Sequence, residues 1–471
     1  MKIVSTSWLC LSVASLLLLS PAARAQEPEK AETPPPANVS DKWTTRLYGF
    51  VELDAVHDST QAFNDLGGWT STALPRAYTY QGSHGRTQFT ARNSRFGLVF
   101  APPIYHRVST TGTLEGDFMG NQPSDASESS SITFGTFRLR VASALVETPY
   151  VDVLLGQGWV LFGFQPFFLP ASTFLLPPPG EVFKRDAQLR LSHTFKSAPI
   201  NFSLAASANR PPQRDGELPD FHAGLLLSFN GWKGIHTPGT DGQRIVGSAL
   251  DGLTLGVSAA GRRFKVTDFQ GTALGTTPDP RSGNSAQGYA IAADAMIPVV
   301  PAHSVDDRSN ALTLTGEFST GTGYADLLGG LVTNAGGPTT PAVPYPAVPN
   351  SPDKYAPNIQ GGLVTYDNAG GLHTINWRTA MVGLQYYLPP SGKVFISGNY
   401  AQAQSNNVAK WADPGQKGAI FDKTRYVDAN LFWDATAALR FAGSYQVLWQ
   451  DFANGDRVRN DRAEFSAYLW L

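Results

Sequence analysis

The sequence has one cysteine, few charges, and no long apolar run after its first 25 residues. Because Cys10 lies near the start of the chain, we expect no disulfide, thiol chemistry or sulfur-ligated metal site in the rest of it. Charged residues make up 16% of the chain and the formal net charge is -2, so bulk electrostatics give no reason to expect a nucleic-acid partner. The lack of an apolar run of about 18 residues argues against spanning helices.

Catalytic motifs are also missing. None of the 8 histidines lies in a recognisable nucleophile or metal-binding motif. The sequence contains no G-x-S-x-G, H-E-x-x-H or Walker pattern. We therefore predict no enzyme activity, no cofactor and no metal site.

The start of the chain predicts export. Lys2, an apolar run over 8–19 and the small-x-small site at 23–25 form the pattern of a secretory signal peptide. Its removal would take Lys2 and Arg24 away and change the formal charge from -2 to -4. We predict a signal peptide over 1–25, a proline-rich disordered leader over 26–42 and a single barrel domain over 43–471.

Period-two alternation dominates the rest of the chain, and it is clearest over 137–147. Phe137, Leu139, Val141 and Leu145 fall on one face, and Arg138, Arg140 and Ala142 fall on the other. A break at 147–150 leads into a return strand over 151–162, so the two segments predict a hairpin with one apolar face and one polar face.

Similar segments fill the chain, and one of them, 88–100, slips once at 94–95 as a bulge would. Short turns should lie on one rim, and long loops such as 231–248, 267–284 and 323–371 on the other. We predict an all-β, transmembrane antiparallel β-barrel of about 16 strands, with the apolar segment 164–180 folded into the lumen. The predicted strands cover 46–56, 88–100, 106–120, 137–147, 151–162, 183–195, 199–209, 221–230, 250–264, 286–298, 310–322, 372–388, 393–404, 423–434, 436–450 and 458–471.

The polar faces of these strands supply candidate pore-lining residues. We expect a transverse field, with arginines on one wall and carboxylates opposite, because charges near a narrow point set ion selectivity. The alternative is that the charges pair with one another and have no selective role. The candidates are Arg46, Glu52, Asp54, Arg92, Arg95, Glu115, Asp117, Arg138, Arg140, Lys184, Arg190, Arg378 and Arg440.

Aromatic residues divide in a similar way. We assign Tyr445, Trp449, Tyr468 and Trp470 to the aromatic girdles at the membrane interfaces. Trp377 and Trp433 are alternatives for a contact between subunits.

Five early segments form a recognisable series: LYGFVELDAV (47–56), TARNSRFGLVF (90–100), GTLEGDF (112–118), FRLRVASALVE (137–147) and LLGQGWVLFG (154–163). In order and spacing they resemble the first five strands of the DcaP-like family of trimeric outer-membrane porins. The resemblance implies a sixteen-stranded homotrimeric channel with a loop in each pore, favouring small anionic solutes such as dicarboxylates. The chain departs from the family at 156–160, which reads GQGWV in place of a GQTWS-like stretch, and in lacking a coiled-coil segment near its start.

The expected function is passive diffusion of small hydrophilic solutes through the outer membrane of a Gram-negative-type cell. The expected partners are outer-membrane lipid and two further copies of the chain. An outer-membrane adhesin stays open as an alternative because long loops serve both roles. A barrel enzyme and a soluble propeller are less favoured, since neither catalytic motifs nor repeats of about 40 to 50 residues are present.

Overall fold

The structure is a computed structural model in which residues from Asp41 to Leu471 form one compact unit. The predicted signal peptide and the leader, except Lys42, lie outside the described residues. The structure describes residues 42–61, 73–120, 135–164, 178–213, 216–236, 249–267, 283–331, 359, 361–367, 371–412 and 414–471.

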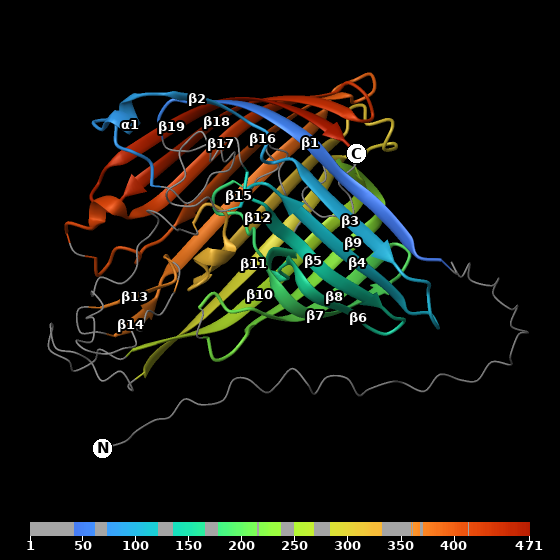
Figure 1. Cartoon of the computed structure of the whole chain (residues 1–471), viewed down its shortest axis with the longest axis horizontal. Coiled ribbons are helices and arrows are strands. Elements are labelled where there is room, and N and C mark those ends of the chain that lie inside the picture. The colour runs from blue at the N-terminus through green and yellow to red at the C-terminus, as the bar shows by residue number, and fades with distance from the viewer. Residues whose placement is uncertain are drawn as a thin grey trace, which may run out of the picture. The chain divides into compact units, whose positions relative to one another are not determined.

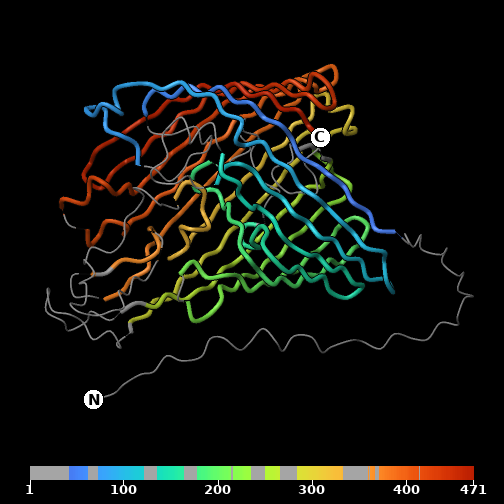
Figure 2. Tube along the Cα trace, in the orientation of Figure 1, coloured from blue at the N-terminus to red at the C-terminus, as the bar shows by residue number. Residues whose placement is uncertain are grey.

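The sheet closes on itself through its first and last strands. β1 (Thr44–Asp58) pairs antiparallel with β19 (Arg457–Trp470) on one side. On the other side β1 pairs with both β2 (Arg86–Thr90) and β3 (Arg95–Ala101). These two are halves of one strand, interrupted over 91–94, where the sequence predicts a bulge. Counted so, the closed barrel has sixteen antiparallel strands, which confirms the predicted fold class (Figures 1 and 2).

Each remaining wall strand pairs with the next one along the chain, and each corresponds to one of the predicted segments. They are β4 (Ser109–Asp117), β5 (Arg138–Glu147), β6 (Asp152–Trp159), β7 (Arg185–Lys196), β8 (Ile200–Asn209), β9 (Asp220–His236), β10 (Ala249–Thr267), β11 (Gly283–Val300), β12 (Leu312–Thr322), β15 (Asn376–Tyr387), β16 (Val394–Gln404), β17 (Phe421–Asp434) and β18 (Leu439–Phe452).

A few small elements lie outside the wall. β13 (Val364–Tyr366) and β14 (Leu372–Thr374) form a separate two-stranded ribbon. The helical turns are α1 (Tyr80–Ser83), η1 (Phe162–Phe164), η2 (Ala325–Leu327) and η3 (Lys417–Ala419). None of the helices in the described ranges is long and apolar enough to cross a membrane.

Connections alternate between two rims, as the up-and-down strand order requires. Turns such as 148–151 and 388–393 lie on one rim, and the longer connections after β1, β4, β6 and β12 lie on the other. The prediction for 231–248 was wrong. Residues 231–236 extend β9, and the β9–β10 connection lies on the short-turn rim because β9 runs toward it.

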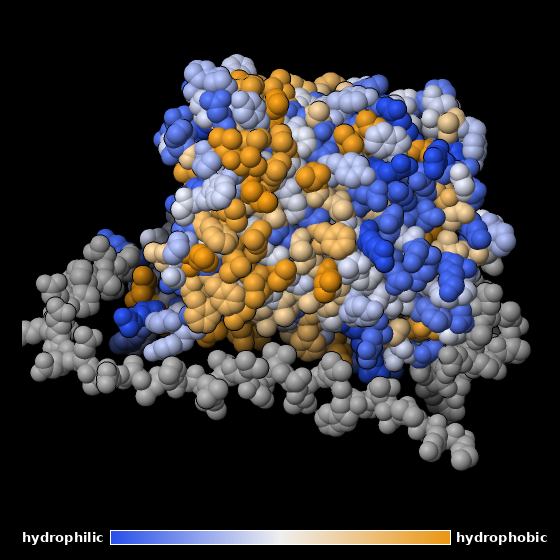
Figure 3. All heavy atoms as spheres, turned by 180° about the vertical axis from the view of Figure 1, so that it is seen from behind, coloured by the Kyte–Doolittle hydropathy of each residue, from blue (hydrophilic) through white to orange (hydrophobic). Residues whose placement is uncertain are grey.

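The two faces of the wall differ as expected for a barrel in lipid. Along β19, Phe465 and Leu469 point outward and are about half exposed, whereas Arg462 and Ser466 belong to the alternate, inward row and are fully buried. On the face shown in Figure 3, hydrophobic side chains gather in a broad patch over the wall and hydrophilic ones gather beside it. An apolar outward row and a polar inward row are the pattern of a transmembrane barrel.

Aromatic side chains cover part of the inner face near the short-turn rim. Phe395 and Phe432 stack with ring centroids 4.5 Å apart. Tyr468 and Trp470 stack at 5.7 Å and are buried with them, so their assignment to an exposed girdle was wrong. Trp377 is also fully buried inside the barrel and cannot form a subunit contact, whereas Trp433 is exposed. Alternation from Phe465 already predicts that Tyr468 and Trp470 face inward. The prediction of a girdle rested on their residue type alone.

Candidate functional site

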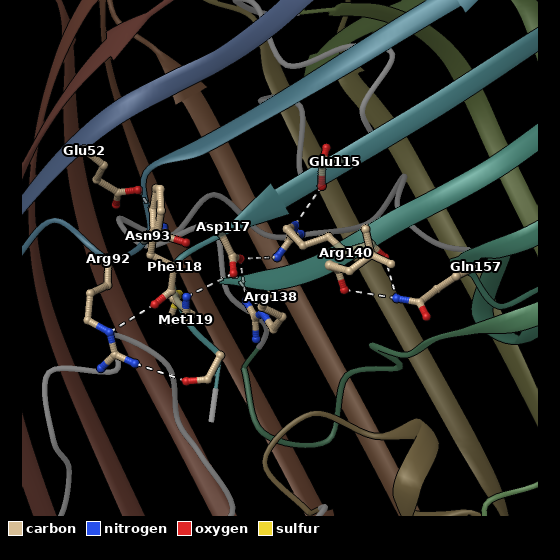
Figure 4. Close-up of polar contacts among 12 residues, drawn as sticks. Glu52, Arg92, Asn93, Glu115, Asp117, Phe118, Met119, Arg138, Arg140 and Gln157 are labelled. Atoms are coloured by element: carbon tan, nitrogen blue, oxygen red, sulfur yellow. Dashed lines mark hydrogen bonds and ion pairs between the residues drawn. The ribbon is translucent and has the colours of Figure 1, made fainter. Parts of the chain in front are cut away.

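Carboxylates of β4 and arginines of β5 form a buried network on the inner face (Figure 4). Arg138 donates two hydrogen bonds to the Asp117 carboxylate, at 2.9 and 2.6 Å. Arg140 donates to Glu115 at 2.7 Å and to Asp117 at 2.9 Å. Asp117, Glu115 and Arg140 are at most 1% exposed. The sequence predicted that these four residues face inward, but it placed the carboxylates opposite the arginines. Glu115 and Asp117 instead lie on β4, directly beside Arg138 and Arg140 on the neighbouring strand β5.

A β-bulge at Arg140 shapes this network. The pairing of β4 with β5 runs from Glu115 with Val141 directly to Gly116 with Leu139, so Arg140 is the extra residue. A bulge re-aims a side chain and reverses the alternation beyond it. Arg140 and Val141 are therefore both buried, and Leu145 shares the inward row of Thr111. The predicted outward position of Leu145 was wrong for this reason.

Gln157 of β6 compensates for the bulge. Its side-chain amide donates to the carbonyl oxygens of Leu139, at 3.0 Å, and Arg140, at 3.2 Å. Pairing of β5 with β6 starts only at Ala142, so these two carbonyls have no partner in that ladder. The side chain of Gln157 takes the place of the missing backbone donors.

Arg95 lies beside the network without joining it. Its side chain is 1% exposed, and none of its three nitrogens has a hydrogen-bond partner among the described residues. Its guanidinium lies 5.1 Å from the ring centroid of Phe50, which provides a cation–π contact. Arg95 thus adds a positive charge that is not neutralised by a direct ion pair.

The interruption between β2 and β3 is held by side chains. Arg92 donates to the carbonyl oxygens of Phe118, at 3.2 Å, and Gly120, at 3.3 Å, and so ties this corner to the end of β4. Asn93 donates to the Glu52 carboxylate at 2.6 Å. Both contacts appear in Figure 4. The predicted inward direction of Arg92 and Glu52 matches their burial.

The remaining candidates are scattered around the barrel. Asp54 accepts a hydrogen bond from Ser466 at 2.6 Å. Lys184 lies 3.8 Å from Asp186, beyond the lumen segment. Arg190 is inward on β7 and bonds Gln188 at 3.1 Å. Arg440 is buried near the short-turn rim and donates to Asp434 at 2.5 Å. Arg46 lies near the start of β1, the strand that also carries Glu52, and is exposed.

Arg378 lies on the wrong face for a lumen residue. It is exposed on β15 in the same row as Val382 and Leu384, while Trp377 and Thr379 beside it are buried. The prediction that Arg378 faces inward was wrong. In this strand the outward row mixes Arg378 with apolar residues and the inward row holds Trp377, so residue type alone suggests the opposite register.

Sequence reasoning missed two buried ion pairs. Arg262 of β10 bonds Asp220 at 2.7 Å and also contacts Asp326 of η2. Arg462 of β19 bonds Asp58 of β1 at 2.8 Å and thus locks the closing seam. The alternation in β19 already placed Arg462 inward, so that signal was present. Arg262 and Arg263 are adjacent, and only the register decides which of them faces inward.

The described flanks of the predicted lumen segment do lie inside the barrel. On one side of it, the Gly163 N–H donates to Ser258 of β10 at 2.8 Å. On the other, the Val182 N–H donates to Glu317 of β12 at 2.7 Å. Ser258 and Glu317 belong to inward rows. The central part of that segment, 165–177, lies outside the described residues.

Glu181 brings a third carboxyl to this contact. Its side chain is fully buried, and its oxygens accept no hydrogen bond from the described part of the chain. Asp294 and Glu317 are direct partners on β11 and β12 and lie close to it. Burial, together with these two neighbours, raises the pKa of the Glu181 carboxyl well above its usual range. Among the described residues, no group of three histidine or acidic side chains is arranged to hold a metal ion.

Comparisons with known proteins give the fold a precedent. No protein-family model matches the sequence, and no curated protein matches it. The outer-membrane channel DcaP of Acinetobacter baumannii superimposes with a TM-score of 0.61 at 16% identity, over 92% of this chain and 98% of that one. The chain has a porin-like fold. An anion-selective porin from Comamonas acidovorans matches with a TM-score of 0.47 at 10% identity, over 91% and 100% of the two chains.

Proposed function

We propose that this protein is an outer-membrane porin through which small hydrophilic solutes diffuse passively, with anions preferred. The observation that carries the proposal is a closed barrel whose inner face holds more arginines than its local carboxylates neutralise. Five inward arginines form what we term the basic wall: Arg92, Arg95, Arg138, Arg140 and Arg190.

Two members of the basic wall decide the sign of the preference. Arg138 and Arg140 are balanced by Glu115 and Asp117. Arg95 and Arg190 form no ion pair within the described ranges. In a narrow, partly desolvated path, such positive charges raise the local concentration of anions. The pore-lining role belongs to the inward candidates and to Arg262 and Arg462, and not to Arg378.

The proposed channel is tested with purified protein in a planar bilayer. Stable, voltage-independent conductance steps, together with swelling of protein-containing liposomes in isotonic sugars, are the expected result. No conductance, combined with loss of surface binding when a long loop is deleted, would move the assignment to an adhesin.

We further propose that the active form is a homotrimer and that its contact uses an exposed phenylalanine patch on β3–β5. Phe96, Phe118 and Phe137 point outward, with ring centroids 6.1 Å from Phe96 to each of the others. The absence of a side chain on Gly116 leaves room for the Phe137 ring, since an added Cβ would lie 2.2 Å from it. Large exposed aromatic patches mark contact surfaces. Serine at Phe96 and Phe137 should yield monomers in unheated gels, with the barrel intact.

A further inference from the structure

The outer face carries an apolar groove over β8–β12 with a volume of about 530 Å³. Its floor forms where small residues lie side by side, because Ala223 of β9 and Ala259 of β10 are direct partners. Its sides are Leu204, Ile291 and Phe318, which are about half exposed. The groove forms because the small outward side chains of Ala223 and Ala259 have larger side chains around them.

A polar hollow of about 540 Å³ adjoins this groove and shares Ile291 with it. Going around the barrel, Ile291 is paired through Thr320 with Arg378, which is paired in turn through Gln404 with Lys423. These residues share one outward row from β11 to β17. The row therefore changes from apolar to cationic along its length.

The two ends of the row lie at different depths. Arg378 is the third residue of β15 and Lys423 the third of β17, so both are near the long-loop rim. Ile291 and Ala259 lie eight residues from the long-loop ends of β11 and β10. Long loops mark the external side of an outer-membrane barrel. The cations thus face the outer leaflet's head groups, and the groove its acyl chains.

One carboxylate, Asp422, also lines the hollow and attracts Lys423 electrostatically. The side chains of Arg378 and Lys423 make no hydrogen bond or ion pair with any residue in the described ranges. Arg459, also the third residue of its strand and outward, instead donates to Asp461 at 2.7 Å. Two cations beside one carboxylate leave a positive charge in the hollow, and such a charge next to an apolar surface favours an anionic ligand.

We propose that this surface binds one molecule of a phosphorylated, multiply acylated glycolipid of the outer leaflet. Its phosphate would lie between Arg378 and Lys423, where Asn376 and Gln404 line the hollow, and one acyl chain would fill the groove over Ala223 and Ala259. Clustered cations recognise lipid phosphates, and a concave apolar groove fixes a chain that a flat wall would not.

The test is a native mass-spectrometry titration of the detergent-purified protein with diphosphoryl lipid A and with the same lipid after removal of its phosphates. Wild type should bind the diphosphoryl form at one copy per chain. The variant R378Q/K423Q should bind it about 30-fold more weakly, since two membrane-surface cations are lost. It should bind the dephosphorylated lipid as wild type does.

Matched variants separate a site from ordinary lipid contact. R459Q removes an outward cation that is already paired, and A463W adds bulk at an exposed outward alanine on β19; both should leave binding unchanged. A259W fills the groove and should weaken binding of both lipids. Equal binding by all variants would overturn the proposal, as would a loss of trimers in A259W without a change in lipid affinity, which would assign the groove to a second copy.

Discussion

Two regions of the inner face differ in the ionisable side chains that they hold and in the partners of those side chains. On the basic wall, the carboxylates Glu115 and Asp117 lie between arginines, and every carboxylate there has a guanidinium partner. On β11 and β12, Asp294 and Glu317 are direct cross-strand partners. Glu181 of the lumen segment lies close to both, and the Val182 N–H donates to Glu317. β8, β9 and β10 separate the two regions.

The difference shows how one alternating pattern serves two purposes. Arginine and carboxylate on adjacent strands make a rigid wall with a surplus of positive charge. Carboxyl groups without an arginine partner, such as Glu181, form a contact with the lumen segment that we expect to depend on pH. The transverse field expected from the sequence stays a prediction. Glu115 and Asp117 lie on the basic wall itself, and the carboxyl groups away from that wall include Asp294 and Glu317.

Breaking the basic wall should have the largest effect on stability. Replacing Asp117 with alanine removes the carboxylate partner of Arg138 and leaves the buried Arg140 with Glu115 alone. Breaking a buried ion pair in this way costs about 3–5 kcal/mol. Urea unfolding, followed by tryptophan fluorescence, measures this. The control D461A breaks the half-exposed pair with Arg459 and should cost at most about 1 kcal/mol. Equal losses would mean that the wall is not a special ion-pair network.

The bulge at Arg140 gives a smaller, separable effect. Leucine at Gln157 leaves the carbonyls of Leu139 and Arg140 without donors and should cost about 1–3 kcal/mol in the same unfolding measurement. Q157E keeps the size and removes the donor, so it should destabilise similarly. If Q157L were as stable as wild type, the bulge would not depend on this side chain.

The contact of Glu181 with Asp294 and Glu317 should make the stability of the protein depend on pH. The raised pKa of Glu181 means that its neutral form favours the folded contact. Its contribution is complete below the usual glutamate pKa of about 4.3 and is lost as pH rises through the raised value. Stability of wild type relative to E181Q should therefore fall in thermal melts as pH increases above the usual glutamate pKa. A constant difference would show that Glu181 does not titrate in this range.

Much of the fold could be read from alternation and turn spacing, because a side-chain period of two reports which residues share a face. All sixteen strands, and the inward position of Glu52, Asp54 and Asp117, followed from it. Alternation no longer reports the face of a residue beyond a β-bulge, where one strand has an extra residue. The bulge at Arg140 reversed the face of Leu145. The register between β4 and β5, which brings Glu115 to Arg140, is not encoded in either segment alone.

Residue type was the weaker guide. Tyr468 and Trp470 fill the barrel interior near the short-turn rim, although aromatics of this kind are common in interfacial girdles. Arg378 faces outward, although an arginine is expected on the water-filled inner face of such a barrel. In both cases tertiary packing and register decide the face, and a single sequence does not report either.

The most direct test of the proposed selectivity is the reversal potential of wild type and the variant R95Q/R190Q in a planar bilayer under a potassium chloride gradient. We predict anion preference in wild type and a shift toward zero in the variant, because these two arginines carry the uncompensated charge. Cation preference in wild type, or an unchanged potential in R95Q/R190Q, would contradict the assignment of the basic wall.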